Sequence, residues 1–244
     1  MEVVIAALQP QRVSKHTYFA GALAAISLWL SLSVWAAPHD HPKPIVLAPG
    51  YSALSFVPPA AATYALPALG TAANGPVLDA SGNKLRLHDL FGDKLVVLSF
   101  IYTSCNDVNG CPLATFVMRG VQDKVRADLQ LRKRVRLVSF SFDPDHDTPE
   151  VLAAYSHHFK APEFDWRFLT TASHAQLDPI LEGYGQRVIR DYDAQGRALG
   201  SVSHILRVFL IDKDKRIRNI YSTSFLHADT LANDLRTLLA EQRD

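Results

Sequence analysis

The chain has 244 residues, of which 48% are hydrophobic and 20% are charged, with 25 basic and 24 acidic side chains. This composition excludes an intrinsically disordered chain, and the near balance of charge gives no reason to expect a nucleic acid as a partner. The length is sufficient for one domain with a hydrophobic core and an additional N-terminal segment.

The first 36 residues have the pattern of an export signal. Residues 1–18 contain two basic side chains and one acidic side chain, and residues 19–37 contain no charge. Small residues lie three and one positions before a cleavage point after Ala36. An uncharged run of this length also suffices as a membrane anchor. We therefore expect export to the bacterial periplasm, with residues 1–36 acting as a signal peptide or as a tether to the inner membrane.

Residues 37–67 are rich in proline and alanine. Half of the 14 prolines of the chain fall between Pro38 and Pro67. Proline this dense prevents a continuous helix or sheet, because it lacks the backbone N–H and fixes φ. We interpret residues 37–67 as a spacer, including His39 and His41, and expect the folded domain to occupy residues 68–244.

The first part of this domain predicts a hairpin, a buried strand and a helix. Residues 75–91 alternate about a turn at residues 81–83, and "KLVVLSFIY", residues 94–102, is a continuous apolar run typical of a strand buried on both faces. After Pro112, apolar residues recur at the spacing that lines one face of a helix. They are Leu113, Phe116, Val117, Val121, Val125 and Leu129.

The remaining elements complete an α/β pattern. Residues 135–142 predict a second buried strand, and "DPDHDTPEVLAAYSHHF" opens a second helix with Asp147 or Thr148 as its N-cap. There follow a strand near Phe168, a helix around residues 175–184, a hairpin in residues 203–222 turning at residues 212–214, and a final helix containing Leu231, Leu235, Leu238 and Leu239. Strands alternating with helices predict a thioredoxin-like three-layer domain with a central mixed sheet.

Both cysteines of the chain, Cys105 and Cys111, lie in "SFIYTSCNDVNGCPLATF", where the first buried strand meets its helix. Four interpretations stay open from the spacing. The first is a structural disulfide, although closing so short a loop stabilises the fold only weakly. The second is a redox pair in which the pKa of one thiol is lowered at the helix start. The third is a binding site for a soft metal ion such as Cu(I). The fourth interpretation is a pair of inert buried thiols.

One of the ten histidines stands out as a further ligand. We expect His204 to begin the apolar strand that follows it, at the place where a thioredoxin oxidoreductase has a cis-proline opposite its cysteines. Asp107 and Asn109 offer oxygen atoms in the cysteine loop, but a carboxylate suits Cu(I) poorly, and we interpret both as solvated side chains.

Three segments resemble, in order and separation, the signature segments of the Sco/SenC family of copper proteins. They are "LSFIYTSCNDVNGCPLAT", "SFDPDHDTPEVLAAY" and "SVSHILRVFLID". The resemblance implies a protein with a thioredoxin-like fold. Such a protein is usually tethered to a membrane and helps assemble the copper centre of cytochrome c oxidase. It also implies copper, as Cu(I) or Cu(II), as the bound metal, with Cys105, Cys111 and His204 as its ligands. Two departures are evident: five residues separate the cysteines where three are typical, and Ser203 stands where an aspartate is common.

Two functions follow as hypotheses. The first is a copper chaperone that delivers the metal to a cuproprotein or oxidase subunit and depends on a thiol reductant to keep the cysteines reduced. The second is a thiol–disulfide oxidoreductase that uses Cys105 and Cys111 to exchange electrons with the cysteines of a partner. For the second, we expect Gly110 to adopt a positive φ that lets the two sulfurs meet.

Overall fold

The computed structural model describes residues 51–241, except residue 53. The expected export segment, its membrane contact at residues 19–37 and the first part of the spacer lie outside these residues. In the part of the chain that is described, no helix is long and apolar enough to cross a membrane.

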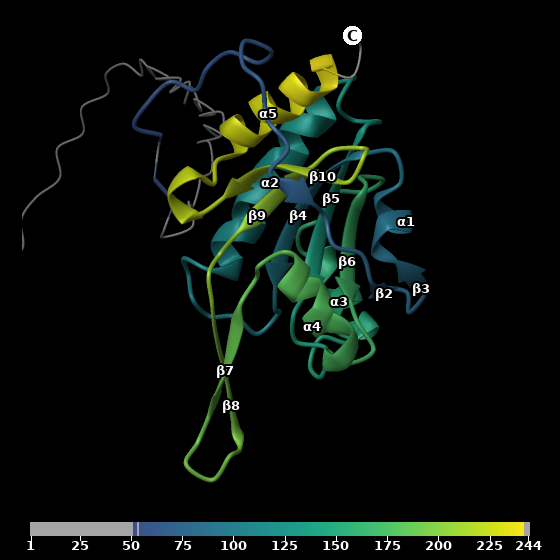
Figure 1. Ribbon diagram of the computed structural model, residues 1–244, viewed down its shortest axis with the longest axis vertical. Coiled ribbons are helices and arrows are strands. Elements are labelled where there is room, and N and C mark those ends of the chain that lie inside the picture. The colour runs from purple at the N-terminus through teal and green to yellow at the C-terminus, as the bar shows by residue number, and fades with distance from the viewer. Residues whose placement is uncertain (1–50, 53, 242–244) are drawn as a thin grey trace, which may run out of the picture. The chain divides into compact units, whose positions relative to one another are not determined.

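The described domain is built on a mixed eight-stranded sheet with the strand order β1-β10-β9-β4-β5-β6-β2-β3 (Figure 1). Its strands are β1 (Gly70–Thr71), β2 (Pro76–Asp79), β3 (Lys84–Arg86), β4 (Leu95–Ile101), β5 (Val135–Ser141), β6 (Trp166–Thr170), β9 (Val208–Ile211) and β10 (Arg216–Tyr221). The central strands β4, β5 and β6 are parallel, whereas β9 is antiparallel to β4. The predicted mixed sheet is therefore confirmed.

Helices cover both faces of the sheet and make it the middle of three layers. The helices are α1 (Leu87–Phe91), α2 (Cys111–Ala127), α3 (Pro149–His157), α4 (His174–Gly183) and α5 (Ala228–Glu241), with a short 3-10 turn at Thr223–Phe225. The buried apolar residues of α2 after Pro112 belong, with those of α3 and α5, to the hydrophobic cluster on one face, whereas Cys111 and the buried residues of α1 and α4 belong to the cluster on the other. This is the predicted thioredoxin-like arrangement.

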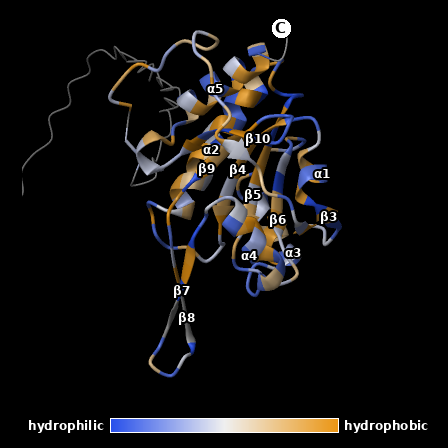
Figure 2. Cartoon of the chain, viewed as in Figure 1, coloured by the Kyte–Doolittle hydropathy of each residue, from blue (hydrophilic) through white to orange (hydrophobic). Residues whose placement is uncertain are grey.

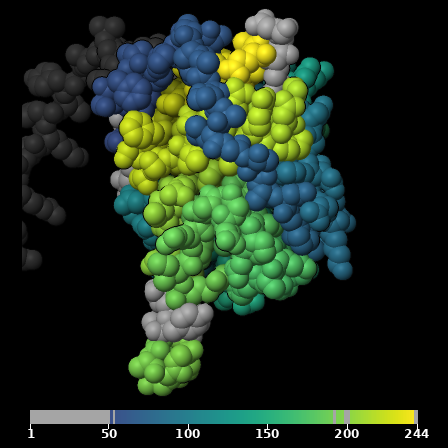
Figure 3. All heavy atoms as spheres, viewed as in Figure 1, coloured from purple at the N-terminus to yellow at the C-terminus, as the bar shows by residue number. Residues whose placement is uncertain are grey.

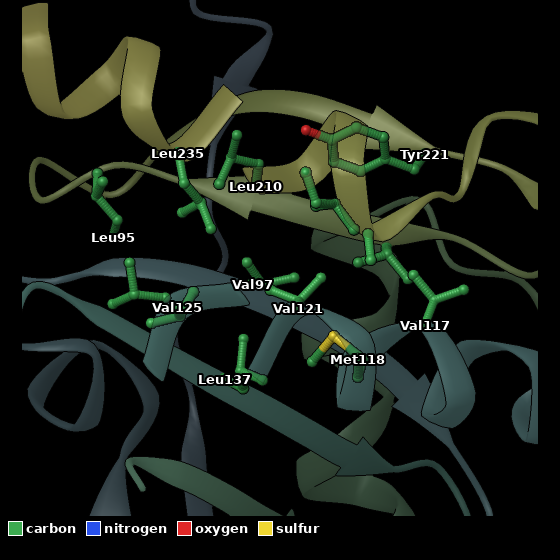
Figure 4. Packing of buried hydrophobic residues seen from close by; sticks show 14 of the residues in the cluster. Leu95, Val97, Val117, Met118, Val121, Val125, Leu137, Leu210, Tyr221 and Leu235 are labelled. Atoms are coloured by element: carbon green, nitrogen blue, oxygen red, sulfur yellow. The ribbon is translucent and has the colours of Figure 1, made fainter. Parts of the chain in front are cut away.

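The central strand β4 is buried on both faces because its side chains alternate between the two clusters. Val97 packs with α2 and α5, whereas Val96 and Leu98 pack with α1 and α4. Figure 4 shows Val97 facing Val121 of α2, and Figure 2 shows the hydrophobic residues concentrated on the central strands. A continuous apolar run in the sequence is the expected signature of such a strand.

Most predicted elements agree with the structure. The turn at residues 81–83 joins β2 to β3, although the alternating pattern after Arg86 forms helix α1 rather than more strand. Thr148 is the N-cap of α3, and its side chain accepts a hydrogen bond from Val151 N at 3.4 Å. The prediction that Leu129 lies on the first helix is wrong, because α2 ends at Ala127 and Leu129 is 72% exposed in the following turn.

A second, two-stranded sheet was not predicted. It consists of β7 (Val188–Tyr192) and β8 (Ala198–His204), which form an antiparallel hairpin that projects from the domain (Figure 1). Asp193 organises the turn, because its Oδ1 accepts from the backbone N–H groups of Gln195 and Arg197. His204 is thus the last residue of β8, and the expectation that it begins the next strand is wrong. Gln186 stabilises the backbone between β8 and β9, because its Nε2 donates to the Ile205 carbonyl at 2.8 Å.

Residues 51–67 are the described part of the expected spacer, with residue 53 left out. The described residues of this segment form no helix or strand and run along α5 (Figure 3). Tyr51 Oη lies 2.9 Å from His227 Nδ1, and Tyr64 Oη donates to Asp234 Oδ1 at 2.5 Å. Farther along, Ala62 N donates to Thr237 Oγ1 at 2.9 Å. These contacts attach residues 51–67 to the C-terminal helix.

Candidate metal and thiol site

The two cysteines lie where β4 ends and α2 begins, as predicted. Cys105 is half-buried in the connecting loop, whereas Cys111 is the first residue of α2 and only 1% exposed. Both are free thiols. Pro112 occupies the first turn of the helix, where its missing N–H leaves no hydrogen bond unmade. The site therefore has one accessible sulfur and one that faces the core.

A tight turn sets the spacing of the two cysteines. Gly110 N donates to the Asp107 carbonyl at 2.8 Å, and Asn109 N donates to Asp107 Oδ1 at 3.0 Å. The expected positive φ at Gly110 is wrong, because its φ is −98°. Glycine is favoured here by space, since a Cβ atom would lie 3.2 Å from the Asp107 carbonyl oxygen. The carboxylate of Asp107 thus stabilises the turn.

Asp147 joins the cysteine loop to the end of β5. It is fully buried, and its Oδ2 accepts from Thr103 N at 3.0 Å and from Ser141 Oγ at 2.5 Å, while its Oδ1 accepts from the Thr103 hydroxyl. The sequence offered Asp147 as a helix cap, but Thr148 has that role. A buried carboxylate with three donors fixes the loop two residues before Cys105.

The two thiols differ strongly in acidity. A hydrogen bond from the Cys111 thiol lowers the pKa of Cys105 to about 5, helped by the backbone N–H groups of Cys111 and Asp107 and by the Tyr102 hydroxyl, against the opposing effect of burial. The same hydrogen bond, burial and the nearby negative charge raise the pKa of Cys111. Cys105 is consequently a thiolate at neutral pH, and Cys111 remains a thiol that donates to it.

His204 completes the set of candidate donors. Its Nε2 lies 3.9 Å from Cys111 Sγ, and its ring packs against Phe142 and Tyr102 with centroid separations of 4.7 and 6.0 Å. Tyr102 and Phe142 also pack against each other, at 5.0 Å. Two aromatic rings therefore hold the imidazole beside the buried cysteine, although His204 comes from a separate hairpin.

The three predicted ligands lie in one place but do not form a closed metal site. Among the residues that the structure describes, no three His, Cys, Asp or Glu side chains are close enough together to hold a metal ion. Two sulfurs and one imidazole are nevertheless a suitable donor set for copper. For the three side chains to bind one metal ion, His204, the Cys105 loop or both must move closer to Cys111.

Other described histidines have partners away from this site. His88 Nε2 lies 2.8 Å from the Ala72 carbonyl, His227 contacts Tyr51, and His174 contacts Asp145. His146, His157 and His158 are exposed. Within the described part of the chain, His204 is the histidine that the fold brings to the cysteines.

Three residues of the site were missed in the sequence. The sequence predicts Tyr102 and Phe142 as strand residues, yet they follow the ends of the neighbouring parallel strands β4 and β5 and contact His204. It predicts Asp147 only as a possible helix cap. A signal was present, because side chains that follow adjacent parallel strands meet at the same edge of a sheet, where reactive groups collect.

Comparison with known proteins identifies relatives of most of the domain. A model of the SCO1/SenC family matches residues 76–240. The SCO1 protein homolog of Bacillus subtilis (strain 168) is 24% identical over 141 residues, which cover 58% of this chain and 68% of that protein.

Solved structures share the fold. The copper-bound ScoI of Arabidopsis thaliana has a TM-score of 0.59 and 20% identity, covering 71% of this chain and 99% of that chain. BsSco, described as a Sco-family cytochrome c oxidase assembly protein with a disulfide switch, has a TM-score of 0.57 and 21% identity, covering 71% and 96% of the two chains.

Proposed function

Because the chain belongs to the SCO1/SenC family, we propose that it binds copper through Cys105, Cys111 and His204 and acts as a copper chaperone in the assembly of a cuproenzyme such as cytochrome c oxidase. The observation that carries the proposal is the meeting of both cysteines and His204 at one edge of the sheet, with 3.9 Å between Cys111 Sγ and His204 Nε2. Copper is the cargo of this function.

The donor set suits copper in both oxidation states. Thiolate sulfur is the preferred ligand of Cu(I), and imidazole nitrogen is well suited to Cu(II). Cys105 is already ionised near neutral pH, whereas Cys111 has to release its proton when it becomes a ligand. Copper uptake should therefore release protons, mainly from Cys111.

Copper titration of the reduced full-length chain tests this function. We expect tight binding of Cu(I), lost in the Cys105→Ser, Cys111→Ser double variant and retained in His157→Ala, which removes an exposed histidine of α3. Equally weak binding by the wild type and the double variant would refute the proposal.

The role of His204 is tested by comparing the two oxidation states. His204→Ala should weaken Cu(II) binding far more than Cu(I) binding, because Cu(I) can remain two-coordinate on sulfur whereas Cu(II) depends on the nitrogen ligand. The reduction potential of the cysteine pair should change little, since the imidazole takes no part in disulfide exchange. If His204→Ala keeps both copper affinities but shifts the pH profile of thiol alkylation, His204 is not a copper ligand.

Location and partners follow from the same proposal. We place the domain in the bacterial periplasm, carried there by residues 1–36 and held at the inner membrane if residues 19–37 are retained. The recipient is a cuproprotein or oxidase subunit that accepts copper or electrons. A thiol reductant is required as well, because a Cys105–Cys111 disulfide cannot supply two thiolates.

Thiol–disulfide exchange is the second candidate function, favoured by the contrast between an accessible, acidic Cys105 and a buried Cys111. The Cys105 thiolate attacks a partner disulfide and releases one partner thiolate, giving a mixed disulfide. Cys111 then loses its proton and attacks Cys105 Sγ, which releases the second partner thiolate. Two electrons thereby pass to the partner, and the chain retains a Cys105–Cys111 disulfide.

A reduction potential and an exchange rate test this second function. An isolated potential below about −300 mV would indicate a merely structural disulfide. A higher potential, with rapid exchange by the wild type and a trapped mixed disulfide in Cys111→Ala, would support the oxidoreductase.

A further inference from the structure

Arg190 connects the β7–β8 hairpin to the rest of the domain. It lies within β7, paired with Val202 of β8. Its Nη2 donates to the Phe142 carbonyl at 3.3 Å and contacts His174 Nδ1 at 2.7 Å. One guanidinium group thus joins the hairpin to the end of β5 and to the first residue of α4.

The chemistry of the guanidinium group fixes the direction of one of these contacts. A guanidinium group has only hydrogen-bond donors, so Arg190 Nη2 donates to His174 Nδ1. On the other side of the ring, His174 Nε2 lies 3.1 Å from Asp145 Oδ2. Asp145 belongs to the "DPDHDTPE" segment, so a chain of hydrogen bonds leads from that segment through His174 to the hairpin.

These contacts lie close to His204. In the β7–β8 register, His204 is opposite Val188 and two positions beyond Val202, so its side chain is on the same face of the hairpin as that of Arg190. The Phe142 residue whose carbonyl binds Arg190 also packs its ring against the His204 imidazole, at 4.7 Å. Within the described residues, β7 and β8 form a sheet of their own and do not pair with the main sheet. The place of His204 therefore depends on side-chain contacts.

We propose that Arg190 is a positioning residue that sets the location of His204 relative to the cysteine pair. This inference rests on the proposed role of His204 as a copper ligand. Without the Arg190 contacts, a smaller fraction of molecules holds His204 within reach of the sulfurs, and the apparent affinity for Cu(II) falls by that fraction. Cu(I), which is held by the two sulfurs, should be affected much less.

The test compares Arg190→Gln with Arg197→Gln in the full-length chain. The control removes the same charge from the same hairpin, but Arg197 is 78% exposed and pairs with Asp193 at the turn. Hydrogen exchange of residues 188–204 is measured without copper, and Cu(I) and Cu(II) affinities are measured by competition. Arg190→Lys, which keeps a cationic donor, serves as the rescue variant.

We expect Arg190→Gln to speed exchange in residues 188–204 and to weaken Cu(II) binding about tenfold, as when the competent fraction falls to about one tenth. Arg197→Gln should leave both unchanged, and Arg190→Lys should recover part of the Cu(II) affinity. Unchanged exchange in Arg190→Gln, or faster exchange with unchanged Cu(II) affinity, would overturn the proposal. If the wild type binds no copper, the proposed function fails, and the exchange of the copper-free variants still decides whether Arg190 holds the hairpin.

Discussion

Replacement of Cys111 by alanine should raise the pKa of Cys105, because the Cys111 thiol is the principal hydrogen-bond donor to the Cys105 thiolate. A hydrogen bond to a charged group contributes about 1.5–3 kcal/mol, and one pKa unit corresponds to about 1.4 kcal/mol. The pKa of Cys105 should therefore rise by about one to two units. Cys111→Ser is the matched control, since a serine hydroxyl retains the donor.

The rate of alkylation of Cys105 by iodoacetamide, followed by mass spectrometry as a function of pH, measures this change. The wild-type rate should rise with a midpoint near the pKa of about 5. The midpoint should move to higher pH in Cys111→Ala and much less in Cys111→Ser. Equal midpoints in the alanine and serine variants, or a wild-type midpoint in the ordinary thiol range, would refute the assignment of the hydrogen bond.

Two further predictions concern a buried and a partly buried carboxylate, those of Asp147 and Asp165. Asp147→Ala should lower the free energy of unfolding by about 2–4 kcal/mol, because Thr103 N–H and Ser141 Oγ lose their acceptor; an unchanged urea midpoint would contradict this. Asp165→Asn should destabilise the domain near neutral pH, because hydrogen bonds from Arg136 and Lys94 outweigh burial and hold the pKa of Asp165 below its usual range. Since this stabilisation is complete above the ordinary carboxyl pKa and lost as the pH falls through the lowered value, the urea curves of the wild type and Asp165→Asn should converge in strong acid.

The sequence predicts those parts of the fold whose hydrophobic pattern matches their burial. Strand β4 is a continuous apolar run because both of its faces are covered, and α2 has a periodic apolar face because only that face is buried. The pattern misleads at Leu129, which continues the spacing of α2 but lies in an exposed turn. Periodicity alone does not mark where a helix ends.

The hairpin was missed because it lies outside the main sheet. Ile189 of β7 is 63% exposed, so this strand lacks the clear alternation that burial of one face imposes. The turn at Asp193 and Gly196, where φ is 77°, was the available signal. His204 could be singled out by its position in the chain, but its strand could not be assigned without that turn.

The cysteine site was predicted in part for a similar reason. Pro112 and the preceding apolar run mark a junction of strand and helix, which places Cys105 and Cys111. The contact between Asp147 and Thr103 joins residues 44 positions apart, and local sequence patterns carry no information on such a pair. Side chains that support a site from a neighbouring strand become evident only when the strand order is known.

The attachment of residues 51–67 to α5 bears on the order in which the domain folds. Tyr51 and His227 are 176 positions apart, and Ala62 and Thr237 are 175 apart. Contacts of such high sequence separation form slowly, because a long loop must close before they contribute any stability. The first described residues therefore have no docking surface until α5 has emerged from the ribosome or from a translocation channel, and native assembly of this domain waits for α5.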